Sequence, residues 1–183
     1  MNCKEKPLYE PDYSELGLQV MESVSSAFPC VTFVVFETRM MNDFLNHLIG
    51  RNTVFVQIEK ESGGAVFRYL QESFPYVLYK PSIREMELYW RNDCVIVTDL
   101  ISEAPLWKDR RGYVTLEKML VDMCCDRLIR WSYSEAEYPD VVVDARDQYQ
   151  LDRRKMLRYA GRRNKRKEIE GYLNAESRWK KFV

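Results

Sequence analysis

The sequence predicts an α/β protein: a mainly parallel sheet of four to five strands, flanked by helices, with a helical C-terminal lobe. Four short apolar runs carry this prediction, and the chain between them is long enough to hold helices. Because the runs are continuously apolar rather than alternating, they are typical of parallel strands that are covered on both faces. They are VTFVVF (31–36), TVFVQI (53–58), YVLY (76–79) and CVIVT (94–98).

Helical spacing of apolar residues is found before and between the predicted strands. DYSELGLQVMESVSSAF precedes the first strand with this spacing, and Pro29 ends the segment. MMNDFLNHLI, GGAVFRYLQESF and SIREMELYWR show the same spacing between strands, so we expect helices there as well. Ser82, which follows Pro81, is the expected N-cap of the last of these helices.

The second half of the chain is mostly helical in pattern. RRGYV predicts one further edge strand, and TLEKMLVDMCCDRLIRW then predicts a helix with Thr115 as its N-cap. Lys118, Asp122 and Asp126 form a narrow polar stripe on a helix that is otherwise apolar nearly all round. We expect the Asp122 carboxylate to pair with Lys118 or with an arginine of the C-terminal lobe, and so to tie the lobe to the sheet. AEYPDVVVDARDQYQ, DRRKMLRYAGRR and KRKEIEGYLNAE predict three more helices.

Length and composition indicate one structural domain. A chain of 183 residues with 46% hydrophobic content can bury one good core, and its few glycines and prolines exclude a disordered tail. Within that domain, residues 1–114 are expected to form the α/β core. Residues 115–183 are expected to form the helical C-terminal lobe, packed on the core.

Several features predict a cytoplasmic protein without a membrane partner. The longest apolar run, VTFVVF, is far shorter than the ~20 residues that cross a membrane. The N-terminal stretch MNCKEKPLYEPDYSE lacks the apolar centre of a signal peptide. The five cysteines include no C-x-x-C pair, which favours a reducing compartment over a disulfide framework.

Three acidic residues follow predicted strands. Glu37 follows the first strand, Glu59 the second and Asp99 the fourth. If these strands are parallel and adjacent, their carboxyl ends meet at the sheet edge where α/β proteins usually bind ligands. The carboxylates could then hold Mg²⁺, as in a metal-dependent nuclease. QIEKES lacks the acid–spacer–lysine pattern of such nucleases, however, and exposure to water also explains polar strand ends. The three acids are therefore weak metal candidates.

Other enzyme chemistry finds little support in the residue types present. His47 is the only histidine, so every catalytic Ser-His or Cys-His set would depend on it. Cys124 and Cys125 lie in a predicted buried helix, where thiols usually act as small hydrophobic groups. ESGGAV has neither of the glycine patterns that bind nucleotide phosphates. We expect no catalytic residues and no cofactor.

A run of positive charge, RRKMLRYAGRRNKRKEI, is the strongest local signal in the sequence. It holds nine Lys or Arg among the seventeen residues from Arg153 to Ile169, in a chain of zero net charge. Residues 151–183 hold twelve Lys or Arg and four Asp or Glu, a balance of +8, which leaves residues 1–150 at −8. Such segregation indicates that the segment either docks on the acidic body of the same chain or meets an acidic partner.

The spacing within this segment predicts a binding surface. Arg154, Arg158 and Arg162 lie at i, i+4 and i+8, so on a helix they form one cationic stripe. A second helix, with Asn164 as its expected cap, would open with residues 165–167, and cations in a first turn favour a nearby phosphate or carboxylate. The predicted partner- or nucleic-acid-binding residues are Arg153, Arg154, Arg158, Arg162, Arg163, Lys165, Arg166 and Lys167.

Several stretches taken together, FETRMMNDFL, VFVQIEKES, LISEAP, TLEKMLVD and KMLRYAGRR, resemble a known family. They are similar to the C-terminal domain of AbiEi-like proteins, the antitoxins of type IV abortive-infection toxin–antitoxin systems, often described as transcriptional regulators. The resemblance covers residues 7–175 and is strongest to an uncharacterised bacterial branch. TLEKMLVD resembles the family's threonine-leucine-x-aspartate helix, with Thr115, Leu116 and Asp122 at the matching positions.

The resemblance implies a non-enzymatic antitoxin that neutralises a nucleotidyltransferase-like toxin and can have a regulatory role. In full-length members an N-terminal winged helix-turn-helix represses the operon, whereas here KPLYEPDYSEL begins almost at once and leaves no room for that module. Operator binding by this chain alone is therefore not expected. Two alternatives stay open: a module that binds DNA or tRNA through the basic helices, and a metal-dependent nuclease.

Overall fold

The computed structural model describes residues 5–176, and its centre is a five-stranded mixed sheet with the strand order β3-β4-β2-β1-β5. The strands are β1 (Phe33–Glu37), β2 (Thr53–Ile58), β3 (Val77–Tyr79), β4 (Cys94–Asp99) and β5 (Gly112–Tyr113). The predicted α/β class is thus confirmed, and the short RRGYV strand is β5, hydrogen-bonded to β1 at the sheet edge.

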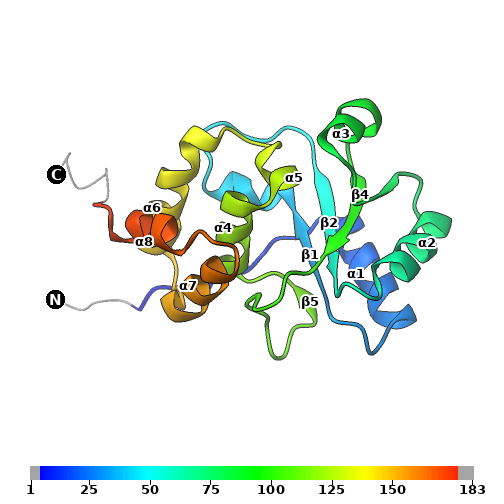
Figure 1. The fold of residues 1–183 in the computed structure, drawn as a ribbon, viewed down its shortest axis with the longest axis horizontal. Coiled ribbons are helices and arrows are strands. Elements are labelled where there is room, and N and C mark those ends of the chain that lie inside the picture. The colour runs from blue at the N-terminus through cyan, green and yellow to red at the C-terminus, as the bar shows by residue number, and fades with distance from the viewer. Residues whose placement is uncertain (1–4, 177–183) are drawn as a thin grey trace.

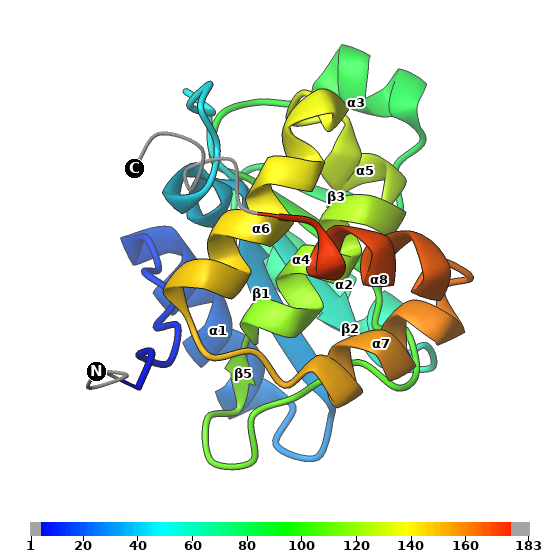
Figure 2. The ribbon, with the colours of Figure 1, turned by 90° about the vertical axis from the view of Figure 1, so that its left-hand side faces the viewer.

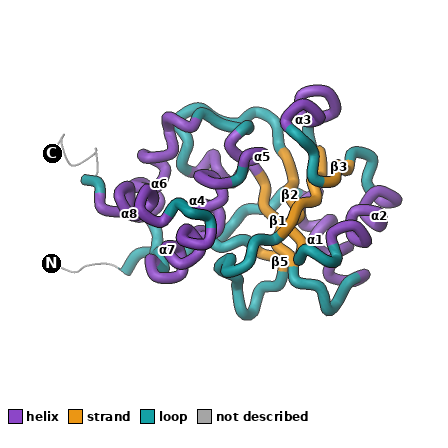
Figure 3. Tube along the Cα trace, in the orientation of Figure 1, coloured by secondary structure: helices purple, strands orange, loops and turns teal. Residues whose placement is uncertain are grey.

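Helices cover both faces of the sheet. Figures 1 and 2 show α1 and α2 on one side and α4, α6, α7 and α8 on the other; Figure 3 shows the strands between these two layers. The helices are α1 (Glu15–Ala27), α2 (Gly63–Ser73), α3 (Ile83–Tyr89), α4 (Leu116–Cys125), α5 (Arg127–Arg130), α6 (Tyr138–Gln148), α7 (Arg153–Arg162) and α8 (Arg166–Asn174). Residues 177–183 of the predicted C-terminal lobe lie outside the described residues.

Two neighbouring strands, β1 and β5, run against the other three. β2, β3 and β4 are mutually parallel neighbours, whereas β1 pairs with β2 in antiparallel register, with Phe33 opposite Ile58 and Glu37 opposite Val54. The sheet is therefore mostly parallel but mixed. Because β1 is antiparallel to its neighbour β2, the carboxyl end of β1 lies at the opposite edge of the sheet from the carboxyl ends of β2, β3 and β4.

The connection between β1 and β2 differs from its prediction. MMNDFLNHLI was expected to be helical, but only the 3-10 helix η1 (Thr38–Asp43) forms, and an irregular loop follows it. Side chains satisfy the backbone of this loop: Ile49 N–H donates to Asn42 Oδ1 at 2.7 Å, and Asn46 N–H donates to Glu137 Oε2 at 2.6 Å. These side-chain bonds take the place of the backbone bonds of a helix. The helical spacing of apolar residues was therefore not sufficient to form an α-helix here.

The caps predicted at Ser82 and Thr115 are present. Ser82 forms a capping box with Glu85 at the start of α3, and the Thr115 hydroxyl accepts from Lys118 N–H at 3.2 Å at the start of α4. The long TLEKMLVDMCCDRLIRW helix breaks at Asp126, whose carboxylate caps α5 by accepting from Leu128 N–H at 2.9 Å. Local hydrogen-bond chemistry thus sets these boundaries.

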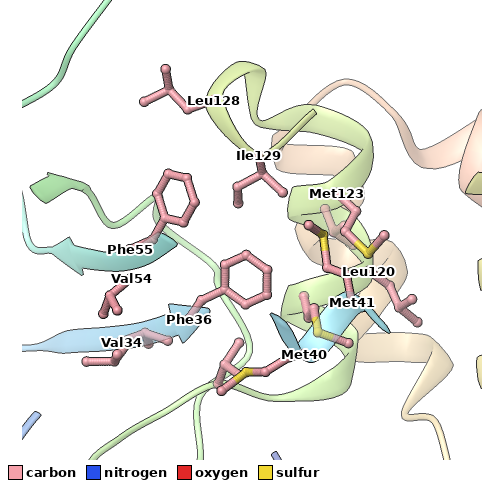
Figure 4. Close-up of a cluster of buried hydrophobic side chains, with 14 of the residues drawn as sticks. Val34, Phe36, Met40, Met41, Val54, Phe55, Leu120, Met123, Leu128 and Ile129 are labelled. Carbon is pink, nitrogen blue, oxygen red and sulfur yellow. The ribbon is translucent and has the colours of Figure 1, made fainter. Parts of the chain in front are cut away.

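The main core lies between the sheet and the C-terminal helices (Figure 4). Phe36 of β1 and Phe55 of β2 stack with ring centroids 6.0 Å apart and point toward the helical layer. Methionines of η1 and α4, including Met41 and Met123, fill the irregular space between the rings and α4. One continuous cluster of buried apolar residues crosses the predicted boundary between residues 114 and 115.

A buried carboxylate fixes α1 to the end of β1. Glu37, 0% exposed, accepts from Ser14 N–H at 2.7 Å, from the Ser14 hydroxyl at 2.5 Å and from Asn52 Nδ2 at 2.7 Å. Gly17, in the first turn of α1, lies directly over this group, and a Cβ built on Gly17 would be 2.6 Å from Glu37 Oε2. Only glycine lets the helix approach the carboxylate so closely.

Substituting Gly17 by alanine is therefore expected to lower the free energy of unfolding by about 1–3 kcal/mol, because the carboxylate must move from its three donors. Gly171→Ala is the matched control, since Gly171 also lies within a helix and has open space around its Cα. We expect that control to gain about 0.5–1 kcal/mol from helix propensity alone. Urea unfolding measures both, and a stabilised Gly17→Ala variant would contradict the close packing.

Candidate functional site

The three predicted metal-ligand candidates do not meet. Glu37 lies opposite Val54, near the start of β2. Asp99 lies opposite Ile58, at the other end of β2, where Glu59 follows the strand. Their expected meeting at one edge was wrong because β1 is antiparallel. Within residues 5–176, no group of three or more His, Cys, Asp or Glu side chains is placed to hold a metal ion.

Each of these acids has a local partner instead. Glu37 holds the Ser14 and Asn52 donors described above. Glu59 accepts from Thr32 N–H at 3.2 Å and from the Ser62 hydroxyl at 3.3 Å, which closes the turn between β2 and α2. Asp99 Oδ1 lies 2.7 Å from Lys80 Nζ. The carboxylates at the strand ends therefore stabilise loops and turns.

A buried polar network joins the sheet to the C-terminal helices. The Lys118 ammonium, fully buried in α4, donates to Asp122 Oδ2 and to Gln57 Oε1 of β2. Gln57 Nε2 donates to the same Asp122 oxygen at 3.2 Å. The expected pairing of Asp122 with Lys118 is confirmed, and Gln57 extends it to a central strand of the sheet.

The other oxygen of Asp122 binds α7. The Tyr159 hydroxyl donates to Asp122 Oδ1 at 2.7 Å, and Arg163 Nη1 lies 3.1 Å from the same atom. The arginine predicted to tie the lobe to the sheet is therefore Arg163. Burial, reinforced by the Asp122 charge, raises the pKa of Tyr159 well above its usual range, so its hydroxyl stays protonated as a donor.

Arg163 consequently leaves the predicted binding surface. Its guanidinium side chain is only 14% exposed and points to a carboxylate inside the molecule. The expectation that Arg163 faces a partner along with its neighbours was wrong, because Asp122 offers a buried partner that sequence spacing does not reveal. The α7–α8 junction also differs slightly: Asn164 takes a left-handed backbone with φ 58°, and Lys165 rather than Asn164 precedes α8 as its N-cap.

The other seven basic residues lie on the outer side of α7 and α8. Met156, Leu157 and Tyr159 are buried on the inner side of α7, which leaves the predicted stripe exposed. We call this set, which is exposed except for the half-buried Lys165, the basic face. It consists of Arg153, Arg154, Arg158, Arg162, Lys165, Arg166 and Lys167.

Acidic or polar neighbours occupy part of the basic face. Arg158 Nε lies 2.8 Å from Glu103 Oε2, Arg162 Nε donates to the Ser102 hydroxyl at 2.7 Å, and Lys165 Nζ lies 2.5 Å from Glu168 Oε2. Arg153 donates to Asn174 Oδ1 at 2.6 Å. Three members, Arg154, Arg166 and Lys167, are exposed and form no ion pair with any residue that the structure describes.

A small pocket of about 270 Å³ opens beside the basic face, at the carboxyl ends of β3 and β4. Five charged residues line this edge pocket: Lys80, Asp99, Asp126, Arg127 and Arg163. Arg163 thus connects the buried network to solvent. Arg127 was not among the predicted site residues, because a lone arginine in an amphipathic segment carries no spacing signal.

The comparisons give a family and no function. A model of a protein family of unknown function, DUF6577, matches residues 1–178. The chain belongs to the DUF6577 family. No curated protein and no solved structure matches it. Among the described residues of this DUF6577 protein, no helix is long and apolar enough to cross a membrane.

The buried network makes a strong prediction for this DUF6577 chain. Replacing Asp122 by alanine leaves Lys118 and Arg163 without their anion, and we expect a loss of about 3–5 kcal/mol in the free energy of unfolding. Glu87→Ala, an exposed acid of α3, is expected to change it by no more than about 0.5 kcal/mol. Thermal and urea unfolding measure both variants, and an unchanged melting temperature for Asp122→Ala would show that the network does not hold the lobe.

Proposed function

We propose that this protein is a non-enzymatic interaction protein of the cytoplasm that binds an acidic protein partner through its basic face. The observation that carries the proposal is the display of exposed cations on two adjacent helices. Three of them, Arg154, Arg166 and Lys167, have no ionic partner in the described part of the chain. Exposed cations held on packed helices attract an oppositely charged surface and orient it.

A protein partner is favoured over a nucleic acid by the acids interleaved with these cations. Glu103 and Glu168 lie within ion-pair distance of Arg158 and Lys165, and Asp152 lies 3.3 Å from Lys155. These carboxylates would repel a continuous phosphate backbone, whereas a protein surface can place its own cations opposite them. Zero net charge for the chain agrees with this choice.

The resemblance to AbiEi-like antitoxins suggests which partner to test. It implies a nucleotidyltransferase-like toxin, neutralised by direct contact, and a regulatory role that comes with such a system. Arg158 and Arg162 of the basic face lie within KMLRYAGRR, one of the stretches on which that resemblance rests, and the other members of the face flank it. DNA or tRNA is the alternative partner, and the unpaired cations Arg154, Arg166 and Lys167 are the observation in its favour.

The test is growth of cells that are induced to make the nucleotidyltransferase-like protein encoded beside this gene. We expect the wild-type chain to restore growth, and the triple variant Arg154→Glu/Arg158→Glu/Arg162→Glu to lose rescue while keeping its melting temperature. The loss follows because the variant changes the charge of the basic face by six units while the buried side of α7 is untouched. Pull-down of the toxin by each variant measures the contact directly.

The matched control is Lys60→Glu/Arg68→Glu/Arg84→Glu, which makes the same change in net charge on exposed residues around α2 and α3. This control is expected to rescue growth like the wild type. Equal loss of rescue in both triple variants would point to net charge rather than the basic face. No rescue by the wild type, together with salt-sensitive binding of labelled duplex DNA or tRNA, would replace the proposal with the nucleic-acid reading.

A further inference from the structure

The edge pocket is the strongest unassigned feature of the molecule. It lies where the parallel strands β3 and β4 end, and carboxyl ends of parallel strands are the usual ligand sites of α/β proteins. The lining also includes residues of α5 and of the connection between α7 and α8. Residues distant in sequence, Lys80, Arg127 and Arg163, therefore line one shallow, open pocket.

The two acids in the pocket already have partners. Asp99 Oδ1 is 2.7 Å from Lys80 Nζ, which balances its charge. Lys80 adopts an unusual left-handed backbone with φ 45°, and its N–H donates to Val97 O at 2.9 Å. Asp126 Oδ1 accepts from Leu128 and Ile129 N–H at 2.9 and 3.3 Å, as the N-cap of α5. The acids are therefore committed to the protein itself.

The two arginines retain donors for an external group. Arg163 bonds to Asp122 and to Tyr159 through Nη1 alone, and no bond of its Nε or Nη2 is formed with the residues described. Because the buried network anchors one corner of the guanidinium, its plane is held in place at the pocket. Arg127 is exposed and has no ionic partner within residues 5–176.

Charge and size together select the ligand. Three cations and two carboxylates line the pocket. Lys118 and Asp122 of the buried network lie behind Arg163, so pocket and network together hold four cations against three carboxylates, an excess of one positive charge. The volume of about 270 Å³ is below the roughly 300–1,000 Å³ of sites that enclose a whole small molecule. Arginine forks recognise planar pairs of anionic oxygens, as found on phosphate.

We propose that the edge pocket binds a single phosphate group, with Arg127 and Arg163 as its donors. The phosphate comes either from the free inorganic ion or from the terminal phosphate of a nucleotide whose remainder lies outside the pocket. This site is distinct from the proposed partner surface, because neither Arg127 nor Arg163 belongs to the basic face.

The test is an NMR titration of ¹⁵N-labelled full-length protein with inorganic phosphate, and separately with AMP, at constant ionic strength in chloride. We expect saturable shifts of the Arg163 and Arg127 Nε–Hε signals and of the amides of residues 80, 99 and 127. Tighter binding of AMP than of phosphate identifies a nucleotide source, and equal affinity identifies the free ion.

Arg127→Gln is the informative variant, because Arg127 is exposed and its loss leaves the core intact. We expect it to weaken phosphate binding about tenfold, the effect of one lost charge-assisted contact. Arg130→Gln is the control, because Arg130 lies on the same short helix but pairs with Glu135 and is not part of the pocket lining. Absence of saturable binding, or equal affinity of Arg127→Gln and wild type, would overturn the proposal.

The growth-rescue assay distinguishes phosphate binding at this site from the proposed binding of a toxin. Arg127→Gln is expected to restore growth as the wild type does, because it leaves the basic face unchanged. The triple variant Arg154→Glu/Arg158→Glu/Arg162→Glu is expected to keep the phosphate-induced shift of the Arg127 signal. Loss of that shift in the triple variant would assign the phosphate effect to the basic face and overturn a separate pocket.

Discussion

The buried carboxylate of Asp122 is the interaction on which the rest of the molecule depends. It holds Lys118 of its own helix, Gln57 of β2, and both Tyr159 and Arg163 at the end of α7. An ammonium and a carboxylate are costly to remove from water, and only a network that bonds nearly every polar atom compensates for it. Satisfying Asp122 therefore fixes α7 in one rotation, with Met156 inward and Arg154, Arg158 and Arg162 outward.

Local signals in the sequence predicted a large part of this arrangement. Ser82 and Thr115 were expected as caps because their hydroxyls accept from backbone groups three residues ahead, and such bonds need no distant partner. The pairing of Lys118 with Asp122 follows from one turn of helix in the same way. The α/β class followed from four apolar runs, and in three of them, β1, β2 and β4, consecutive residues are buried on both faces.

Features that depend on distant residues were not predictable. A strand buried on both faces has the same composition in either direction, so the antiparallel course of β1, and with it the separation of Glu37 from Asp99, leaves no trace in the sequence. The loop after η1 is held by Glu137, about ninety residues away. In the sequence Arg163 cannot be distinguished from its basic neighbours, because its partner Asp122 is distant along the chain. Arg127 reaches the edge pocket because the chain turns at Asp126.

The place of Gln57 also constrains the order in which the chain can fold during synthesis. Its amide lies on a central strand, 2% exposed, and its partners are sixty-one and sixty-five residues further along the chain. The second oxygen of Asp122 gains its partners only when Tyr159 and Arg163 have been synthesised. Until α4 and α7 have been synthesised, this face of the sheet is uncovered, so the Gln57 amide bonds to water and the apolar residues around it stay exposed. Burial of the sheet interior is therefore completed only when the C-terminal helices pack on it.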